Sequence, residues 1–182
     1  MKTKDLVFIA LFAALTAVGG FLNIPTPFVP FSLQFLFCAY AGVLLGSRNA
    51  LLSQLLYLAI GLIGVPVFTK GGGIGYILQP SFGFLLGFAA CAFLIGLIVE
   101  REPKPGFGRI FIAVLSGLLS TYIIGALYLY FITNYLAAPD SKIDIAQAIA
   151  WGVTPFIAFD LIKAVIVSAT SLKILPALRR AL

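Results

Sequence analysis

Long apolar stretches alternate with short polar or charged connections along the whole chain. A helix that crosses a bilayer needs about 20 mainly apolar residues. Six stretches reach or approach this length, and we predict transmembrane helices over residues 5–22, 32–46, 49–64, 79–99, 109–132 and 155–175. The second and third are short and would need tilt, burial in protein or local thinning of the bilayer. The predicted fold is an all-α integral membrane protein, a bundle of six transmembrane helices in a single transmembrane domain over residues 1–182.

The composition also indicates a membrane environment. Hydrophobic residues make up 62% of the 182 residues and charged residues only 10%, whereas soluble domains have about 45–50% and about 25%. A small protein leaves much of its area exposed, so folding alone cannot cover this much apolar surface. We infer that the lipid bilayer solvates the remainder. Cys38 and Cys91 lie in apolar stretches and are interpreted as buried hydrophobic residues rather than as a disulfide.

The Lys and Arg residues are distributed unevenly over the connections. With the N-terminus inside, nine of them fall on the cytoplasmic side and two outside, as the positive-inside rule requires. The nine are Lys2, Lys4, Arg48, Arg101, Lys104, Arg109, Lys173, Arg179 and Arg180, and the two are Lys70 and Lys142. We therefore predict that both termini are cytoplasmic. The net charge of +6 then reflects topology, and no nucleic-acid partner is expected.

Unusual residues are concentrated in the outer connections. Residues 23–34 contain three prolines, and residues 65–81 contain the run "KGGGIG", with Gly73 inside it. Successive glycines let a backbone fold tightly beside a ligand or another loop; the alternative is a flexible connection between two helices. Residues 141–151 could form a short interfacial helix that ends in Trp151. This asymmetry is typical of a binding site that is loaded from outside.

An aspartate and a lysine interrupt the last apolar stretch. An ionisable side chain near the bilayer centre costs about 2.5–3.5 kcal/mol on insertion scales, so Asp160 and Lys163 need an explanation. Their spacing of three places them on one helix face, where they form either a polar site open to the outside or an ion pair that ties this helix to a neighbour. Gln79 at the outer end of the fourth span lines the same pocket or caps a helix. Tyr122 in the fifth span lines the pocket or packs between helices.

Small residues recur every four positions in the first predicted span. Ala10 and Ala14 form one stripe, and Ala13 and Ala17 form another. Small-residue stripes let helices approach each other closely in lipid. The stripes serve packing inside the bundle or present a face to a membrane partner.

Signatures of catalysis and of bound metals are missing from the sequence. The chain has no histidine, which excludes Ser-His-Asp and Cys-His arrangements, and no carboxylates and cysteines cluster at metal-ligand spacing. The glycine-rich connection lacks the G-K-[ST] ending of a Walker motif. We expect no catalytic residue, no metal site and no cofactor.

Several segments together resemble a known family. They are "PFVPFSLQ" (27–34), "GLIGVPVFTKGGGIGYILQPSFGFLLGF" (61–88) and "PFIAFDLIKAVIVSA" (155–169). With the six spans, they are similar to BioY, the biotin-specific S components of energy-coupling factor (ECF) vitamin transporters. The resemblance implies a protein of the bacterial cytoplasmic membrane that captures biotin from outside. It also implies two kinds of partner, a transmembrane coupling subunit and two ATP-binding cassette ATPases.

The resemblance assigns roles to particular residues. The family's acidic and basic pair on the last helix matches Asp160 and Lys163, which would bind the ureido ring of biotin; in an alternative pose Lys163 binds the biotin carboxylate. Four aromatic residues of the outer connections are candidates for an apolar lid, namely Phe28, Phe31, Phe68 and Tyr76.

The resemblance also implies that the small-residue motif of the first helix docks on the coupling subunit, and it matches the Ala10–Ala14 or the Ala13–Ala17 stripe. Two other functions stay open from the residues alone. One is an autonomous biotin carrier, and the other is a membrane scaffold subunit with a structural Asp160–Lys163 pair.

Overall fold

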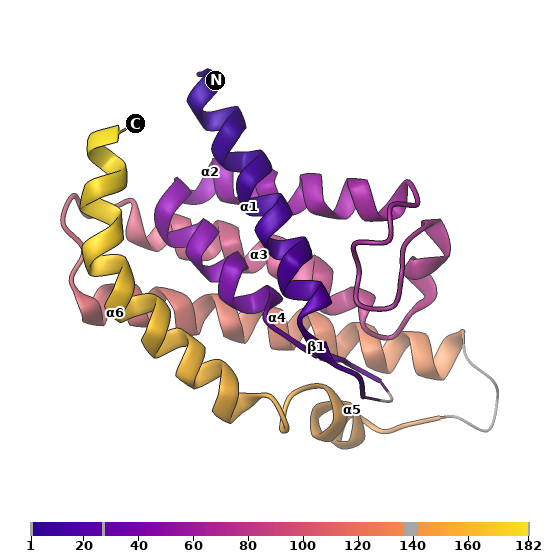
Figure 1. Cartoon of the computed structure of the whole chain (residues 1–182). Coiled ribbons are helices and arrows are strands. Elements are labelled where there is room, and N and C mark those ends of the chain that lie inside the picture. Colours follow the sequence, from indigo (N-terminus) through magenta and orange to yellow (C-terminus); the bar gives the residue numbers. More distant parts are fainter. Residues whose placement is uncertain (1, 27, 137–141, 182) are drawn as a thin grey trace.

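The computed structural model describes residues 2–26, 28–136 and 142–181. Within these residues the chain forms six α-helices, one two-stranded hairpin and one 3₁₀ helix (Figure 1). The helices are α1 (Thr3–Phe21), α2 (Gln34–Leu62), α3 (Phe82–Val99), α4 (Phe107–Tyr135), α5 (Ile145–Gly152) and α6 (Ile157–Ala181). The other elements are β1 (Asn23–Ile24), β2 (Phe31–Ser32) and η1 (Ile74–Leu78). Five of the helices, all except α5, are long and apolar enough to cross a membrane, which confirms the all-helical membrane architecture.

The second and third predicted spans are joined in one helix, α2. Gly46 in its middle has φ of 77° and ψ of 172°, a backbone conformation that glycine adopts without steric cost, and the two segments of α2 run in different directions from there (Figure 1). Glu100, just after α3, accepts hydrogen bonds from the backbone N–H and Oγ of Ser47, both at 2.8 Å. A carboxylate at a helix N-terminus is favourable because of the exposed N–H groups. The predicted break between residues 46 and 49 is therefore a sharp bend at Gly46, and the two segments of α2 on either side of it correspond to the second and third predicted spans.

Close approach of helices builds the core around α3, which packs against both α2 and α4. A Cβ added at Gly96 would lie 2.3 Å from the backbone nitrogen of Ser47, and one at Gly87 would lie 2.8 Å from the Cα of Thr121. Small residues at such positions let helix backbones come together in lipid. Cys38 and Cys91 are both buried and free in this core, as predicted.

The connection between α4 and α6 contains the short helix α5, close to the interfacial helix predicted over 141–151. Residue 141 lies outside the described residues. The Asp144 side chain accepts a hydrogen bond from the backbone N–H of Gln147 at 2.6 Å, and the Gln147 side chain accepts one from the backbone N–H of Asp144 at 2.9 Å. This capping box starts α5, which packs against α4 and carries Trp151 in its last turn.

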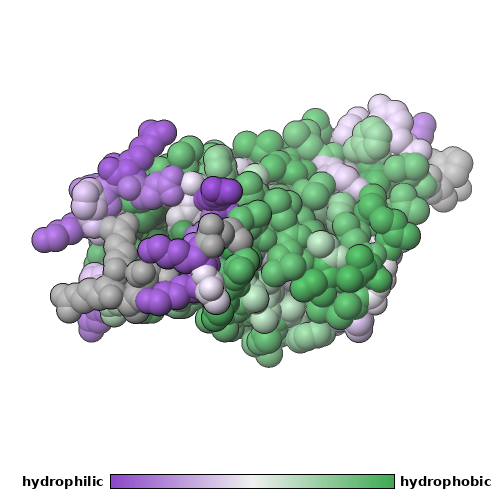
Figure 2. Space-filling model, turned by 90° about the horizontal axis from the view of Figure 1, so that it is seen from above, coloured by the Kyte–Doolittle hydropathy of each residue, from purple (hydrophilic) through white to green (hydrophobic). Residues whose placement is uncertain are grey.

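Hydrophilic residues gather at one end of the face shown in Figure 2, and most of the remaining surface there is apolar. Both chain termini and the α3–α4 connection lie toward that end (Figure 1). This arrangement follows from the uneven distribution of Lys and Arg along the sequence. The side chains of Arg179 and Arg180, which belong to the predicted cytoplasmic set, are outside the described part of the structure.

Candidate functional site

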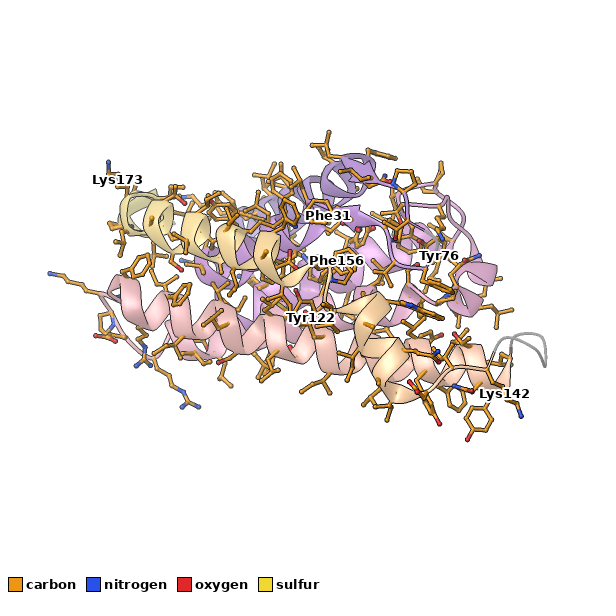
Figure 3. All side chains as sticks on the ribbon, turned by 90° about the horizontal axis from the view of Figure 1, so that it is seen from below. Phe31, Tyr76, Tyr122, Lys142, Phe156 and Lys173 are labelled. Atoms are coloured by element: carbon orange, nitrogen blue, oxygen red, sulfur yellow. The ribbon has the colours of Figure 1, made fainter. Side chains whose placement is uncertain are left out.

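A narrow cavity of about 50 Å³ lies where the connections that precede and follow α2 meet α2, α3, α4 and α6. Apolar surface predominates in its wall, although nine polar residues also line it. The polar lining residues are Ser32, Gln34, Thr69, Tyr76, Ser81, Thr121, Tyr122, Asp160 and Lys163. Figure 3 shows Phe31, Phe156 and Tyr122 near the middle of the molecule, between ends marked by Lys173 and Lys142. A mainly apolar pocket with a few convergent polar groups is typical of a small-molecule site.

Asp160 and Lys163 form a buried ion pair on this wall. Lys163 Nζ lies 2.8 Å from Asp160 Oδ1, and the two side chains are 8% and 9% exposed. The hydroxyl of Tyr122 donates to Asp160 Oδ2 at 2.7 Å. Lys163 Nζ also donates to the carbonyl oxygen of Ser32 at 2.8 Å and lies 4.5 Å from the centroid of the Phe31 ring. The pair therefore joins α6 to α4 and to the connection between α1 and α2.

The pair keeps capacity for further hydrogen bonds. Each carboxylate oxygen of Asp160 accepts one hydrogen bond here and can accept more, while Asp160 and Ser32 account for two of the three donors of Lys163. Asp160 lies in the first turn of α6, where the helix dipole favours a negative charge. The site can thus accept from one ligand N–H and donate to one ligand oxygen at the same place.

The structure brings four predicted residues to the cavity wall, namely Asp160, Lys163, Tyr122 and Tyr76. Phe31 is not a wall residue; it lies against Lys163 and packs on Phe156, with 6.0 Å between ring centroids. Since Phe156 does line the cavity, Phe31 supports the wall from behind.

Three other predicted residues are not among the cavity-lining residues of the described chain. Phe68 is 2% exposed, packs on Tyr76 with 4.6 Å between ring centroids, and so belongs to the core instead of a lid. Gln79 forms the turn into α3, where its carbonyl accepts from the N–H of Phe82, in line with capping rather than pocket lining. Gly73 starts η1 with φ of 101°, and its role is a backbone one.

Sequence reasoning missed several polar wall residues, of which Gln34 is the most informative. Gln34 is only 3% exposed and begins α2 at the end of the "PFSLQ" segment. A neutral amide in an apolar stretch that faces the bundle needs partners, and this was the signal that could have identified it. Thr121, one residue before Tyr122, is 3% exposed and could have been found in the same way.

The two alanine stripes of α1 face in different directions. Ala13 is 3% exposed and packs in the core, and Ala17 is partly buried against it. Ala10 and Ala14 are exposed. The Ala13–Ala17 stripe therefore serves packing within the bundle, and the Ala10–Ala14 stripe lies on the molecular surface.

Comparisons with known proteins agree with one another. A model of the BioY family matches residues 1–180. The probable biotin transporter BioY of Lysinibacillus sphaericus is 52% identical over 133 residues, which cover 73% of this chain and 68% of that protein. The biotin transporter BioY of Thermotoga maritima is 34% identical over 172 residues, which cover 94% of this chain and 95% of that protein. A crystal structure of the S-component for biotin from an ECF-type ABC transporter matches with a TM-score of 0.81 and 29% identity, covering 96% of this chain and 94% of that one.

Proposed function

Because the chain belongs to the BioY family, we propose that it is the S component of an ECF-type importer, which binds biotin on the outer side of a membrane and delivers it inward. The observation that carries this proposal is the Asp160–Lys163 pair inside a mainly apolar cavity. The role is transport and not catalysis. A multi-pass membrane protein with this charge distribution has both termini in the cytoplasm, and we place it in the cytoplasmic membrane of a bacterium.

Biotin matches the chemistry of the cavity. Its ureido ring offers two N–H donors and a carbonyl acceptor, so Asp160 can accept from an N–H while Lys163 donates to the carbonyl. Its fused rings and valeryl chain are apolar and fit the side chains of Phe84, Phe88 and Leu118 on the same wall. An apolar body with polar groups that fix its orientation is the usual pattern of small-molecule recognition.

A second cluster of polar residues on the wall supports a pose in which the ureido ring of biotin lies at the Asp160–Lys163 pair. The Tyr76 hydroxyl lies 3.0 Å from Thr69 Oγ1 and 3.4 Å from Ser81 Oγ, and all three residues line the cavity. Figure 3 shows Tyr76 closer than Tyr122 to the end marked by Lys142. Hydroxyl groups donate to a carboxylate, so this cluster can receive the acidic end of biotin.

Equilibrium binding of biotin to the purified protein in detergent tests the ligand and the site. We expect selective binding over thiamine and riboflavin, and a roughly 10- to 100-fold weaker affinity for Asp160→Asn, because a hydrogen bond to a charged group contributes about 1.5–3 kcal/mol. Asp144→Asn makes the same chemical change at the exposed cap of α5 and should bind like the wild type. A folded wild type without biotin binding, or unchanged binding by Asp160→Asn, would contradict the proposal.

The proposed importer also contains a transmembrane coupling subunit and two ATP-binding cassette ATPases. In this proposal the coupling subunit docks on the exposed Ala10–Ala14 stripe of α1. Ala10 and Ala14 are exposed on a helix that packs mainly against α2, and small residues permit close contact with a partner helix in lipid. The Ala10→Leu/Ala14→Leu variant should bind biotin normally but lose co-purification with the coupling subunit and ATP-dependent uptake. Ala146→Leu, at an exposed alanine of α5, is the matched control. Uptake that persists without the partner subunits would instead identify an autonomous carrier.

A further inference from the structure

A chain of hydrogen bonds leads from the ion pair to both outer connections. Lys163 Nζ donates to the carbonyl oxygen of Ser32 at 2.8 Å, and Ser32 Oγ donates to Gln34 Oε1 at 3.0 Å. Gln34 Nε2 donates to the hydroxyl of Tyr57 at 2.6 Å. The Tyr57 hydroxyl in turn donates to the carbonyl oxygen of Val67 at 3.1 Å. The chain thus runs from α6 through β2 and the two segments of α2 to the second outer connection.

The middle of this chain is buried and has a fixed direction. Gln34 and Tyr57 are 3% and 2% exposed, so a lost partner would leave a polar group without water to replace it. A tyrosine has one hydroxyl hydrogen. Tyr57 can donate it to Val67 because the Gln34 amide presents its N–H to the hydroxyl and its oxygen to Ser32. Each bond in the chain therefore depends on the orientation of the next.

The two ends of the chain lie on segments that enclose the cavity. We define the first outer segment as residues 28–33 and the second as residues 65–71. Val29, Pro30 and Thr69 from these segments line the cavity. The second segment is a compact turn, since the backbone groups of Phe68 and Gly71 exchange hydrogen bonds of 2.9 and 3.1 Å. A displacement of Val67 therefore moves Thr69 with it.

The cavity has to widen before a ligand of the size of biotin enters. Its volume of about 50 Å³ is well below the roughly 300–1,000 Å³ of typical ligand pockets. We propose that Gln34 and Tyr57 are positioning residues that couple the two outer segments, so that both open and close over biotin in one step. This inference rests on the proposed function, because biotin is the ligand whose release it controls.

The protein contains one tryptophan, and the fluorescence of this residue can report on the first outer segment. Trp151 of α5 stacks on Phe28, with 4.3 Å between ring centroids and 4° between planes. Tyr57 contacts the second outer segment through its hydroxyl and touches neither of these rings in the described contacts. Without biotin present, a change at Tyr57 that alters the Trp151 fluorescence must therefore be transmitted between the segments.

Tyr57→Phe removes the shared hydroxyl and keeps the ring that packs on Phe68. We expect bound radiolabelled biotin, chased with unlabelled biotin, to dissociate roughly three- to tenfold faster, as the loss of about one net hydrogen bond predicts. The Trp151 fluorescence change that accompanies release should accelerate by the same factor. Tyr128→Phe is the matched control, because the Tyr128 hydroxyl donates to the carbonyl oxygen of Ile77 in η1, outside this chain. Both of its rates should equal those of the wild type.

Ser32→Ala breaks the same chain at its other end and leaves the backbone carbonyl that Lys163 contacts. If the chain acts as a unit, the double variant Ser32→Ala/Tyr57→Phe releases biotin no faster than the faster single variant. The coupling would be overturned if the double variant released biotin at a rate that multiplies the effects of the two single variants. It would also be overturned if Tyr57→Phe released biotin at the wild-type rate and only its melting temperature were lower. A wild type that binds no biotin would overturn the proposed function itself and the coupling with it.

Discussion

Removing only one member of the Asp160–Lys163 pair should destabilise the protein more than removing both. In Lys163→Met the apolar stem is retained, but the Asp160 carboxylate, 9% exposed, loses the ammonium 2.8 Å away. Breaking a buried pair from one side costs about 3–5 kcal/mol, because an uncompensated charge stays buried. At about 2–4 °C per kcal/mol for a chain of this length, the melting temperature in detergent should fall by roughly 6–20 °C.

The double variant Asp160→Asn/Lys163→Met contains no orphaned charge. Tyr122 can still donate to the asparagine oxygen, and the main remaining loss is the hydrogen bond to Ser32, worth about 1 kcal/mol. We therefore expect the double variant to recover at least half of the melting temperature lost in Lys163→Met.

The same melting assay with biotin separates a structural tie from a binding site. Biotin at 100 times its Kd should stabilise the wild type by about 2.7 kcal/mol, whereas the double variant should show no biotin-dependent shift although its fold is recovered. A double variant that melts as low as Lys163→Met would refute the charge argument. A full biotin-dependent shift in the double variant would show that the pair is only a tie between helices.

Two further predictions, which use three substitutions, follow from the geometry. Gly96→Ala should destabilise the protein by about 1–3 kcal/mol, since the new Cβ would lie 2.3 Å from the backbone nitrogen of Ser47. Gly108→Ala should stabilise α4 by up to about 1 kcal/mol, because its new Cβ meets nothing within 4 Å. The melting temperatures of the two variants should therefore shift in opposite directions from that of the wild type. Tyr122→Phe removes the donor to Asp160 Oδ2 and should weaken biotin binding by roughly three- to tenfold, as measured by equilibrium dialysis; an affinity equal to that of the wild type would show that this hydrogen bond does not position the carboxylate.

The hydrogen bonds around the cavity suggest why charged residues are kept in the last helix. Asp160 and Lys163 are satisfied by each other, by Tyr122 and by Ser32, so the cost of their burial is offset within the protein. Polar groups that are paired but retain bonding capacity can receive a ligand without first being exposed to water. The same contacts connect the site to the first outer segment.

The sequence by itself determined the class of protein, the approximate helices and the central pair. Uninterrupted apolar length is a local property, so the predictions for α1, α3 and α4 lie within three residues of their bounds, whereas the predicted end of α6 is six residues short. An aspartate and a lysine in such a stretch are conspicuous because lipid offers them no partners. For the same reason the sequence singles out Asp160 and Lys163 as a pair on one helix face, and the structure places them 2.8 Å apart.

Only the tertiary structure decided which face of each helix is buried. In a membrane, the core-facing and the lipid-facing sides of a helix are both apolar, so no pattern distinguished the exposed Ala10 and Ala14 from the buried Ala13. Phe68 lies in the connection after α2, and its burial in the core depends on how that connection folds back onto Tyr57 of α2. Gln34 and Tyr57 are 23 positions apart, and their hydrogen bond exists because Gly46 turns one half of α2 relative to the other. Contacts of this kind depend on how helices pack in three dimensions, which local composition does not specify.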